Sequence, residues 1–190
     1  MTSEEVLDRF KTSGALLEGH FILSSGLHSA AYLQCAIALQ APSVAGEFGA
    51  AIAAKFGGAQ IETVASPAIG GLIIGYEVAR QLGGRFIWTE REAGQMTLRR
   101  GFSLRRGERV LVVEDVITTG GSTRDTIEAL RQHGAEVVAA ASIIDRSGGK
   151  ADVGVKLFSL ASLEVPAVLP AECELCARGE EAVKPGSRKQ

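Results

Sequence analysis

The chain has 190 residues, of which 46% are hydrophobic, and its formal net charge at pH 7 is −2 with a pI near 6.0. This length and this apolar fraction predict one domain with a sizeable core and a small lobe attached. The nearly balanced charge argues against a protein that binds nucleic acid through bulk electrostatics, because such domains are usually basic, so any anion site must be local.

The cysteine content and the N-terminal sequence favour an intracellular protein. Three cysteines are too few for a disulfide framework. Residues 1–5 contain no basic region followed by an apolar run, and no stretch of about 18 apolar residues is present, so neither a signal peptide nor a membrane span is expected. We therefore expect a soluble cytoplasmic protein with no membrane or nucleic-acid partner.

The N-terminal third is predicted to contain two helices with an irregular segment between them. Apolar residues recur at helical spacing over residues 3–17, which predicts a helix with Ser3 as its N-cap. Residues 19–34, rich in Ser, Gly and His, are expected to be irregular. A second helix is predicted to begin after Pro42 and to end at Gly57-Gly58, where glycine relieves the strain of a helix end.

Residues 61–160 alternate between strand and helix patterns. The pattern predicts strands over residues 61–65, 85–89, 109–113, 136–144 and 155–160, and helices over residues 71–82 and 122–133. Apolar strands that alternate with helices are typical of a parallel sheet covered on both faces. The predicted fold class is α/β, with a central, mostly parallel sheet flanked by helices.

Two segments do not follow this alternation. Residues 90–107 show little periodicity and are long enough to predict a functional lid rather than a passive connection. Between Glu90 and Arg106 there are five arginines and two glutamates, a local charge of +3, which suits a lid over an anion. The tail from residue 166 onward is expected to be irregular, and residues 185–190 are expected to be loose.

The most informative segment is residues 110–123, in which a buried strand leads through an acidic pair into a turn and then a helix. The first N–H groups of a helix lack intrahelical partners and lie at the positive end of its macrodipole. Gly120 and Gly121 allow the backbone close to a ligand, and four hydroxyl side chains add donors. These are Thr118, Thr119, Ser122 and Thr123. Together they predict a cradle for a phosphomonoester.

Glu114 and Asp115 stand directly before this cradle. Adjacent side chains of a strand point to opposite faces, so both reach one ligand only if the strand ends at the pair. Two carboxylates beside a phosphate require a partner that is positive or rich in hydroxyls, such as a ribose diol, a developing ribosyl cation or Mg²⁺. The alternative is that residues 118–123 merely cap a helix, for a gain of about 1 kcal/mol. Capping explains neither the acidic pair nor the doubled glycine.

Residues 112–123 resemble the phosphoribosyl-pyrophosphate signature of type I phosphoribosyltransferases. The resemblance implies the fold of that family, and it implies that Glu114 and Asp115 bind the ribose hydroxyls while the turn holds the 5-phosphate. It also implies Mg²⁺ as cofactor, carried by the pyrophosphate, with Asp115 as the one candidate protein ligand. The implied binding residues in this segment are Glu114, Asp115, Val116, Ile117, Thr118, Thr119, Gly120, Gly121 and Ser122.

Residues 19–34 resemble the N-terminal hood of orotate phosphoribosyltransferases. The resemblance implies that Tyr32 and Leu33 contact orotate, that Ser24 stands where many relatives carry a lysine, and that Thr118 also lies at the base. Without the later signature, a small β-hairpin packed on the core would be the preferred interpretation of this segment.

Residues 143–146, Ile-Ile-Asp-Arg, provide a third match at the end of an apolar strand. The resemblance implies that Arg146 contacts the base. Orotate carries a carboxylate, and a planar guanidinium can bind one through paired hydrogen bonds. The alternative is a surface pair between Asp145 and Arg146, which would contribute little.

The lid is where the sequence departs from the family. Many orotate enzymes carry an arginine, two lysines and a histidine there, whereas residues 89–102 contain no lysine and no histidine. Arg91 matches one basic position and is the catalytic and pyrophosphate-binding candidate of the lid, while Glu90 and Gly94 fall near others. The turn at residues 66–71 also lacks a lysine found in part of the family, but its backbone N–H groups suit a pyrophosphate.

The resemblance covers nearly the whole chain as one domain, with a hood at about residues 1–40, a core at about 41–165 and a tail at about 166–190. It implies transfer of ribose 5-phosphate from phosphoribosyl pyrophosphate to orotate, giving orotidine 5′-phosphate and pyrophosphate in pyrimidine (UMP) synthesis. It also implies a homodimer in which the lid of one subunit serves the other. A purine phosphoribosyltransferase and a non-catalytic regulator of the same fold are the alternatives; the hood argues against the first, and the lack of a DNA-binding module against the second.

Cys173 and Cys176 raise the question of a zinc site. A structural zinc site needs four ligands. Only these two lie together, because Cys35 and the three histidines are far away in the sequence. A zinc site would need ligands from a neighbouring chain or a distant histidine, so an ordinary pair of reduced cysteines is the preferred expectation.

Overall fold

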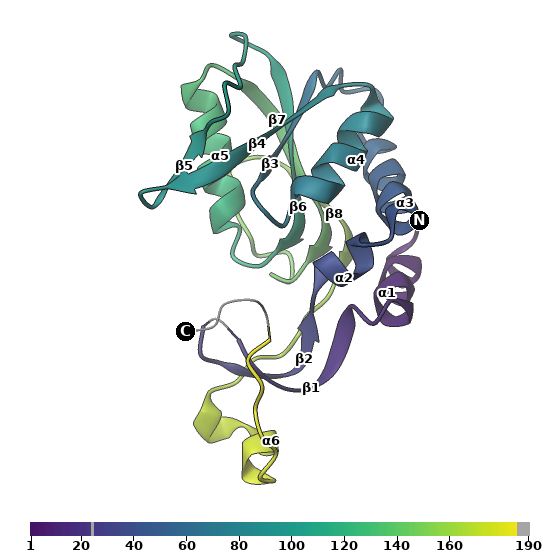
Figure 1. The fold of residues 1–190 in the computed structure, drawn as a ribbon, viewed down its shortest axis with the longest axis vertical. Helices are drawn as coiled ribbons and strands as arrows, with labels where there is room; N and C mark the ends of the chain where they lie inside the picture. The colour runs from purple at the N-terminus through teal and green to yellow at the C-terminus, as the bar shows by residue number, and fades with distance from the viewer. Residues whose placement is uncertain (24, 186–190) are drawn as a thin grey trace.

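The computed structural model describes residues 1–23 and 25–185, which form a main body built on one sheet and a smaller lobe below it (Figure 1). The sheet has the strand order β5-β4-β3-β6-β7-β8, and only β4 and β5 pair antiparallel. The predicted α/β class with a mostly parallel sheet is thereby confirmed. The strands are β3 (Thr63–Pro67), β4 (Arg85–Glu92), β5 (Gln95–Leu98), β6 (Arg109–Ile117), β7 (Glu136–Asp145) and β8 (Leu157–Ser162).

Helices cover both faces of the sheet, which explains why its central strands are apolar on both sides. One core cluster joins Leu111 and Val113 of β6 to α1, α2, α3 and α4, and the other joins Val110 and Val112 to α5. Alternate residues of β6 thus enter opposite cores, as the pleat of a strand requires. The helices are α1 (Ser3–Thr12), α2 (Cys35–Leu39), α3 (Pro42–Ala53), α4 (Leu72–Leu82) and α5 (Gly121–Gln132).

The predicted helix ends need three corrections. The first helix ends at Thr12 rather than at residue 17, and Leu16 and Leu17 belong to the following strand, β1 (Leu16–Ile22). The N-cap of α1 is Thr2 rather than Ser3, because the Thr2 hydroxyl accepts from the Glu5 N–H and the Glu5 carboxylate accepts from the Thr2 N–H, a capping box. The helix that begins at Pro42 ends at Ala53, and turns rather than helix lead to Gly57-Gly58.

Strand β6 is longer than predicted, because it continues through the acidic pair to Ile117. Glu114 pairs with Ser142 of β7 and Val116 pairs with Ile144. The expectation that the strand ends at Glu114 and Asp115 is therefore wrong, and the turn that forms the cradle begins only after Ile117.

The smaller lobe contains a hairpin of β1 (Leu16–Ile22) and β2 (His28–Leu33). The segment predicted to be irregular is thus mostly strand. The tail is also more ordered than predicted as far as residue 185: it runs back along the hairpin, with Val168 paired to His28 and Val183 paired to Phe21. Between these two contacts it forms a short 3-10 turn and helix α6 (Glu174–Ala177), the lowest element in Figure 1. The prediction that the last residues are loose falls on residues 186–190, which lie outside the described residues.

The predicted lid is in large part a second hairpin. Strand β4 extends to Glu92, Ala93 and Gly94 form a two-residue turn with positive φ at both positions, and β5 returns along β4. Leu98 of β5 is buried. The prediction of an aperiodic segment is therefore wrong for residues 90–98. No helix in the described residues is long and apolar enough to cross a membrane.

Candidate active site

An open pocket of about 270 Å³ lies where β3 and β6 end at the sheet's carboxyl edge. In open α/β sheets this edge is where ligands bind, because loops and helix N-termini meet there. Three segments of the chain form the wall of the pocket: the turn after β3, the end of β6, and the turn that leads into α5. The lining residues are Pro67, Ala68, Gly70, Glu114, Val116, Ile117, Thr118, Thr119, Gly120, Gly121, Ser122 and Thr123.

The turn into α5 has the form of an anion cradle. Gly120 occupies the N-cap position with a φ of 75°, and no side chain caps the helix. A Cβ on Gly120 would lie 2.7 Å from Val153 Cγ1, so both the backbone angle and the space require glycine. Thr118 and Thr119 are exposed, and only a long contact of 3.4 Å joins the Thr119 hydroxyl to the Gly121 N–H. The interpretation of this turn as a side-chain cap is therefore wrong, and the helix's first N–H groups face the pocket.

The acidic pair lies across the pocket from this cradle, close to the turn after β3. A Cβ added to Gly70 would lie 2.8 Å from Asp115 Oδ1, and one added to Gly71 would lie 3.2 Å from Glu114 Oε1. Both carboxylates therefore face this turn although β6 does not end at them. Asp115 achieves this by folding back, since its Oδ1 accepts from the Val116 N–H at 2.7 Å.

Burial raises the pKa of Glu114, and the neighbouring Asp115 raises it further. Burial likewise raises the pKa of Asp115, although hydrogen bonds to its carboxylate partly oppose the shift. Within the described chain neither carboxylate has a salt bridge to a basic side chain. The pair is thus poised to accept ligand hydroxyls or a cation, the arrangement expected of a functional site.

Arg146 follows β7 and has a partly buried side chain. Its Nε is buried and has no hydrogen-bond partner in the described residues. Burial lowers the pKa of the guanidinium, and the Cys35 thiol and Tyr32 phenol lie near enough to oppose that shift. Asp145 does not pair with it, because the Asp145 carboxylate accepts from the N–H groups of Ser147 and Gly149. The surface-pair interpretation of Arg146 is therefore wrong.

Three other predicted site residues lie in different surroundings. Leu33 is buried in the core, so only its backbone is available to a ligand. Arg91 lies on β4 outside the pocket lining, and its guanidinium bonds to Asp125 Oδ2 at 2.8 Å and to the Gly94 carbonyl at 2.6 Å. Ser24 lies outside the described residues.

Cys35 is a neighbour of the site that the sequence did not indicate. It lies at the start of α2, and its thiol interacts with Asp115. Burial and then the charge of Asp115 raise the pKa of this thiol well above its usual value. No motif surrounds Cys35, and only the fold brings it to the end of β6, so nothing in the sequence pointed to it.

Comparisons with known proteins agree with this geometry. A family model described as "Phosphoribosyl transferase domain" matches residues 45–165. The orotate phosphoribosyltransferase of Caldicellulosiruptor bescii is 53% identical over 190 residues, all of both chains. That of Thermotoga maritima is 51% identical over 185 residues, 97% of each chain.

Solved structures show the same likeness. The crystal structure of orotate phosphoribosyltransferase from Aeropyrum pernix matches with a TM-score of 0.68 and 31% identity over 83% of this chain and 93% of that one. The Mycobacterium tuberculosis enzyme in complex with 5-phospho-α-D-ribosyl 1-diphosphate matches with a TM-score of 0.65 and 25% identity, over 82% and 96%.

The chain therefore belongs to the phosphoribosyltransferase family, with the type I fold that the signature at residues 112–123 implied. Within that family, the relatives from Caldicellulosiruptor bescii and Pelotomaculum thermopropionicum, which match it over its full length, are orotate phosphoribosyltransferases.

Proposed function

We propose that this chain is an orotate phosphoribosyltransferase, transferring ribose 5-phosphate from phosphoribosyl pyrophosphate to orotate. The observation that carries the proposal is that the α5 cradle and the acidic pair lie at one pocket, with Arg146 directly beside it. The Arg146 N–H donates to the carbonyl of Ile117, which lines the pocket, and its buried Nε has no hydrogen-bond partner in the described residues. Each feature suits one part of the two substrates.

The cradle is assigned to the 5-phosphate. The N–H groups of the first turn of α5 and the exposed Thr118 and Thr119 hydroxyls supply donors to a phosphomonoester. Gly121 allows close approach, and Ser122 adds a third hydroxyl. Val116 and Ile117 line the same pocket as the walls between the phosphate and the ribose.

Glu114 and Asp115 are assigned to the ribose hydroxyls and to the charge that develops on the ribose. The backbone of Gly70 and Gly71 lies against these carboxylates and is assigned to the pyrophosphate. Mg²⁺ fits here, because two buried carboxylates with raised pKa values lack a basic partner in the described chain, and Asp115 with the substrate's own oxygens would hold it. When bound, the ion neutralises charge on the departing pyrophosphate.

Orotate is assigned to the space between Arg146, Tyr32 and the turn at Thr118. Among the described residues the Arg146 guanidinium forms no ion pair, so the carboxylate of orotate can bind it through paired hydrogen bonds. In the reaction, the bond from ribose C1 to pyrophosphate oxygen breaks and a bond from C1 to a ring nitrogen of orotate forms, while that nitrogen loses its proton to solvent or to the departing pyrophosphate. The protein's contribution is positioning and electrostatic stabilisation of the ribosyl cation by the acidic pair.

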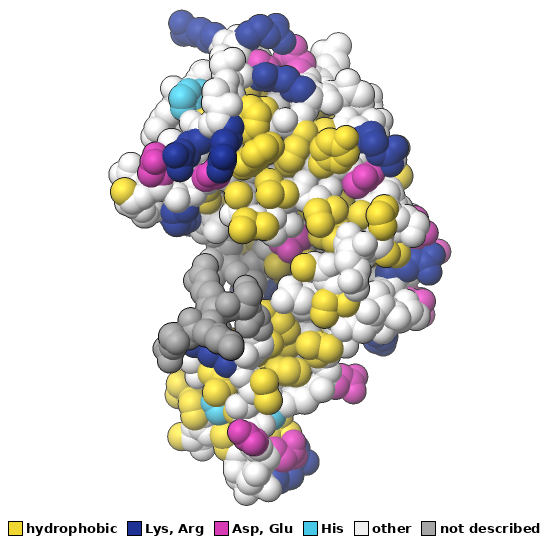
Figure 2. Space-filling model, viewed as in Figure 1, with side chains coloured by type: hydrophobic (Ala, Val, Ile, Leu, Met, Phe, Trp, Pro, Cys, Tyr) yellow, Lys and Arg dark blue, Asp and Glu magenta, His cyan; other side chains and the backbone are white. Residues whose placement is uncertain are grey.

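A homodimer is part of the proposal. Ile69, Ile73 and Tyr76 are exposed and recur at helical spacing from the turn after β3 into α4. Figure 2 shows hydrophobic side chains gathered over the part of the face that α4 occupies in Figure 1. A second copy seated there would lie beside the pyrophosphate turn, which supports a site that two subunits share, with Arg91 reaching the neighbour's pyrophosphate.

The two alternatives from the sequence fit less well. A purine base is neutral near pH 7 and would leave Arg146 without a counter-charge. A non-catalytic regulator that binds the same ribose ligand would share the cradle and the acidic pair, but it would have no use for a cation at Arg146 that faces an acceptor's carboxylate.

Pyrophosphate release tests the proposal. The purified chain is incubated with phosphoribosyl pyrophosphate, Mg²⁺ and one acceptor at a time: orotate, uracil, adenine or hypoxanthine. Release with orotate alone is the expected result. Release with adenine or hypoxanthine would favour the purine enzyme, and none with any acceptor would favour the regulator.

A further inference from the structure

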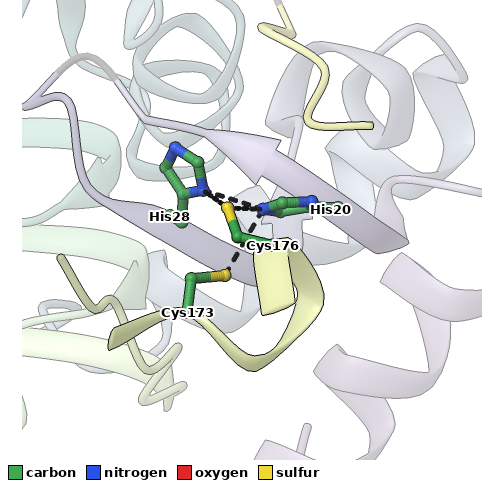
Figure 3. A group of neighbouring side chains, drawn as sticks. All are labelled: His20, His28, Cys173 and Cys176. Carbon is green, nitrogen blue, oxygen red and sulfur yellow. Dashed lines mark hydrogen bonds between the residues drawn. The ribbon is translucent and has the colours of Figure 1, made fainter. Parts of the chain in front are cut away.

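Four potential metal ligands converge in the smaller lobe, and none of them lines the pocket of the candidate active site. They are His20 of β1, His28 of β2, and Cys173 and Cys176 at α6. Figure 3 shows the two imidazoles and the two thiols pointing toward one another between the hairpin and the tail. One ligand atom from each lies within 4.8 Å of all the others. In the sequence only Cys173 and Cys176 lie close together, and the fold brings the two distant histidines to them.

The separations approach those of a tetrahedral zinc site. Zn–N bonds of about 2.0–2.1 Å and Zn–S bonds of about 2.3 Å place tetrahedral ligand atoms about 3.3–3.8 Å apart. Here Cys173 Sγ lies 3.4 Å from His20 Nε2, while Cys176 Sγ lies 3.6 Å from that nitrogen and 3.2 Å from His28 Nδ1. The two nitrogens are 2.7 Å apart, so they need to separate by about 0.6 Å around a metal.

The orientation of His20 is a separate observation that points to a ligand. Its Nδ1 lies 2.8 Å from the carbonyl oxygen of Glu180, which can only accept, so Nδ1 carries the proton. Nε2 therefore presents its lone pair to the cluster. A histidine whose second nitrogen donates to a backbone carbonyl is the usual arrangement at metal sites, because that bond fixes the ring and its tautomer.

Charge and burial favour a metal over four neutral side chains. His20, His28 and Cys173 are buried, whereas Cys176 is exposed and can close the site. Two thiolates and two neutral imidazoles around Zn²⁺ make a group with no net charge, which suits a mostly buried position. Two thiol protons leave as the metal binds.

We propose that His20, His28, Cys173 and Cys176 form a structural zinc site that fastens the C-terminal tail to the N-terminal hairpin. Mixed nitrogen and sulfur ligation selects zinc over Mg²⁺, which takes oxygen ligands. Four protein ligands leave no open position, so the role is structural rather than catalytic. Tyr32 lies on the same hairpin, so the site also steadies the hood on the orotate side of the pocket.

Metal content after purification under reducing conditions from zinc-supplemented medium tests the site. The expected result is about one zinc per chain. Cys176→Ser and His28→Ala should lose most of it. The chain offers matched controls in its third cysteine and third histidine: Cys35→Ala and His133→Gln should both keep the zinc. Cys176 and His133 are exposed, so that pair of variants is expected to fold.

Melting and cobalt substitution provide the second measurement. A strong chelator should lower the melting temperature of the wild type to that of Cys176→Ser and should leave Cys176→Ser unchanged. Co²⁺ added to the metal-free wild type should give the intense visible bands of a tetrahedral site with thiolate ligands, and Cys176→Ser should lose them.

A zinc-free wild type without a tetrahedral cobalt spectrum would leave the four residues as a hydrogen-bonded cluster and overturn the proposal. Zinc retained by both Cys176→Ser and His28→Ala would place the metal elsewhere and overturn it equally.

Discussion

Glu114 is a buried carboxylate whose nearest acidic neighbour is Asp115, and its pKa is raised by both burial and that neighbour. The folded chain therefore binds more protons than the unfolded chain above the ordinary pKa of glutamate. Stability consequently falls as the pH rises from the unfolded pKa through the folded one. The pair thus costs stability in the unliganded protein at neutral pH, and a bound cation or ribose offsets that cost.

Glu114→Gln tests this trade between stability and function. The amide cannot ionise, so the variant should melt a few degrees higher than the wild type at pH 8, with about 2–4 °C for each kcal/mol gained. The gain should shrink toward pH 4, where the wild-type carboxyl is protonated. Turnover should fall by about 10²–10³-fold. Melting scans across this pH range, with turnover measured beside them, provide the check; a variant less stable than the wild type at pH 8 would contradict the account.

At the scale of elements, the close packing of the turn after β3 against strands β3 and β6 shapes the pocket. Gly71 is the N-cap of α4, and a Cβ there would lie 2.9 Å from the Val113 carbonyl of β6 and 3.0 Å from Ser66 Cβ of β3. Neither neighbour is the flexible end of a side chain, so the backbone itself would have to move.

Gly71→Ala should therefore shift the turn away from the acidic pair. We expect a loss of stability of about 1–3 kcal/mol and an affinity for phosphoribosyl pyrophosphate that falls at least about tenfold, as 1.4 kcal/mol corresponds to tenfold. Gly57→Ala is the control, because a Cβ there meets nothing within 4 Å. Calorimetric titration of both variants measures the effect. Equal affinities in the two would show that this contact does not matter for the site.

The elements differ in how well the sequence predicts them. Strand β6 and helix α5 are predictable because an unbroken apolar run leads into a glycine turn and then a periodic helix. Hairpin β4–β5 is not predictable in this way, because charged residues obscure the alternation of apolar and polar side chains. Glu90 of β4, for example, pairs at 2.6 Å with Arg100, which follows β5. Tail pairing such as that of Phe21 with Val183 joins residues far apart in the chain, which no local pattern reveals.

The site residues also differ in how well the sequence predicts them. The phosphate cradle and Arg146 lie in local motifs, so the sequence indicates them directly. The contact of Cys35 with Asp115 and the meeting of His20 with Cys173 depend on how distant segments pack. Arg91 is a different case. The sequence indicates it as a lid residue, but its contact with Asp125 of the same chain is visible only in the structure.

At the scale of the whole molecule, the proposal that two subunits share the lid makes a prediction about mixed dimers. The pair of Arg91 with Asp125 is nearly half exposed on both sides, so opening it costs only about 0–1 kcal/mol. Mixing inactive Arg91→Ala chains with inactive Asp115→Asn chains should restore part of the activity, because each hybrid dimer has one site with both residues intact. Activity that stays absent after subunit exchange has been demonstrated would mean that Arg91 acts within its own chain or not at all.

The central claim is that the hood and the core meet at one acceptor site, where Arg146 faces the carboxylate of orotate. The most direct test is the affinity of Arg146→Ala for each substrate separately. Orotate binding should weaken by about 1.5–3 kcal/mol, the value of a lost charged hydrogen bond, or about ten- to a hundredfold. Phosphoribosyl pyrophosphate should bind as it does to the wild type, since the cradle and the acidic pair are untouched. Arg9→Ala, which removes an exposed pair with Glu47, should change neither affinity. Orotate affinity that is unchanged in Arg146→Ala would contradict the account.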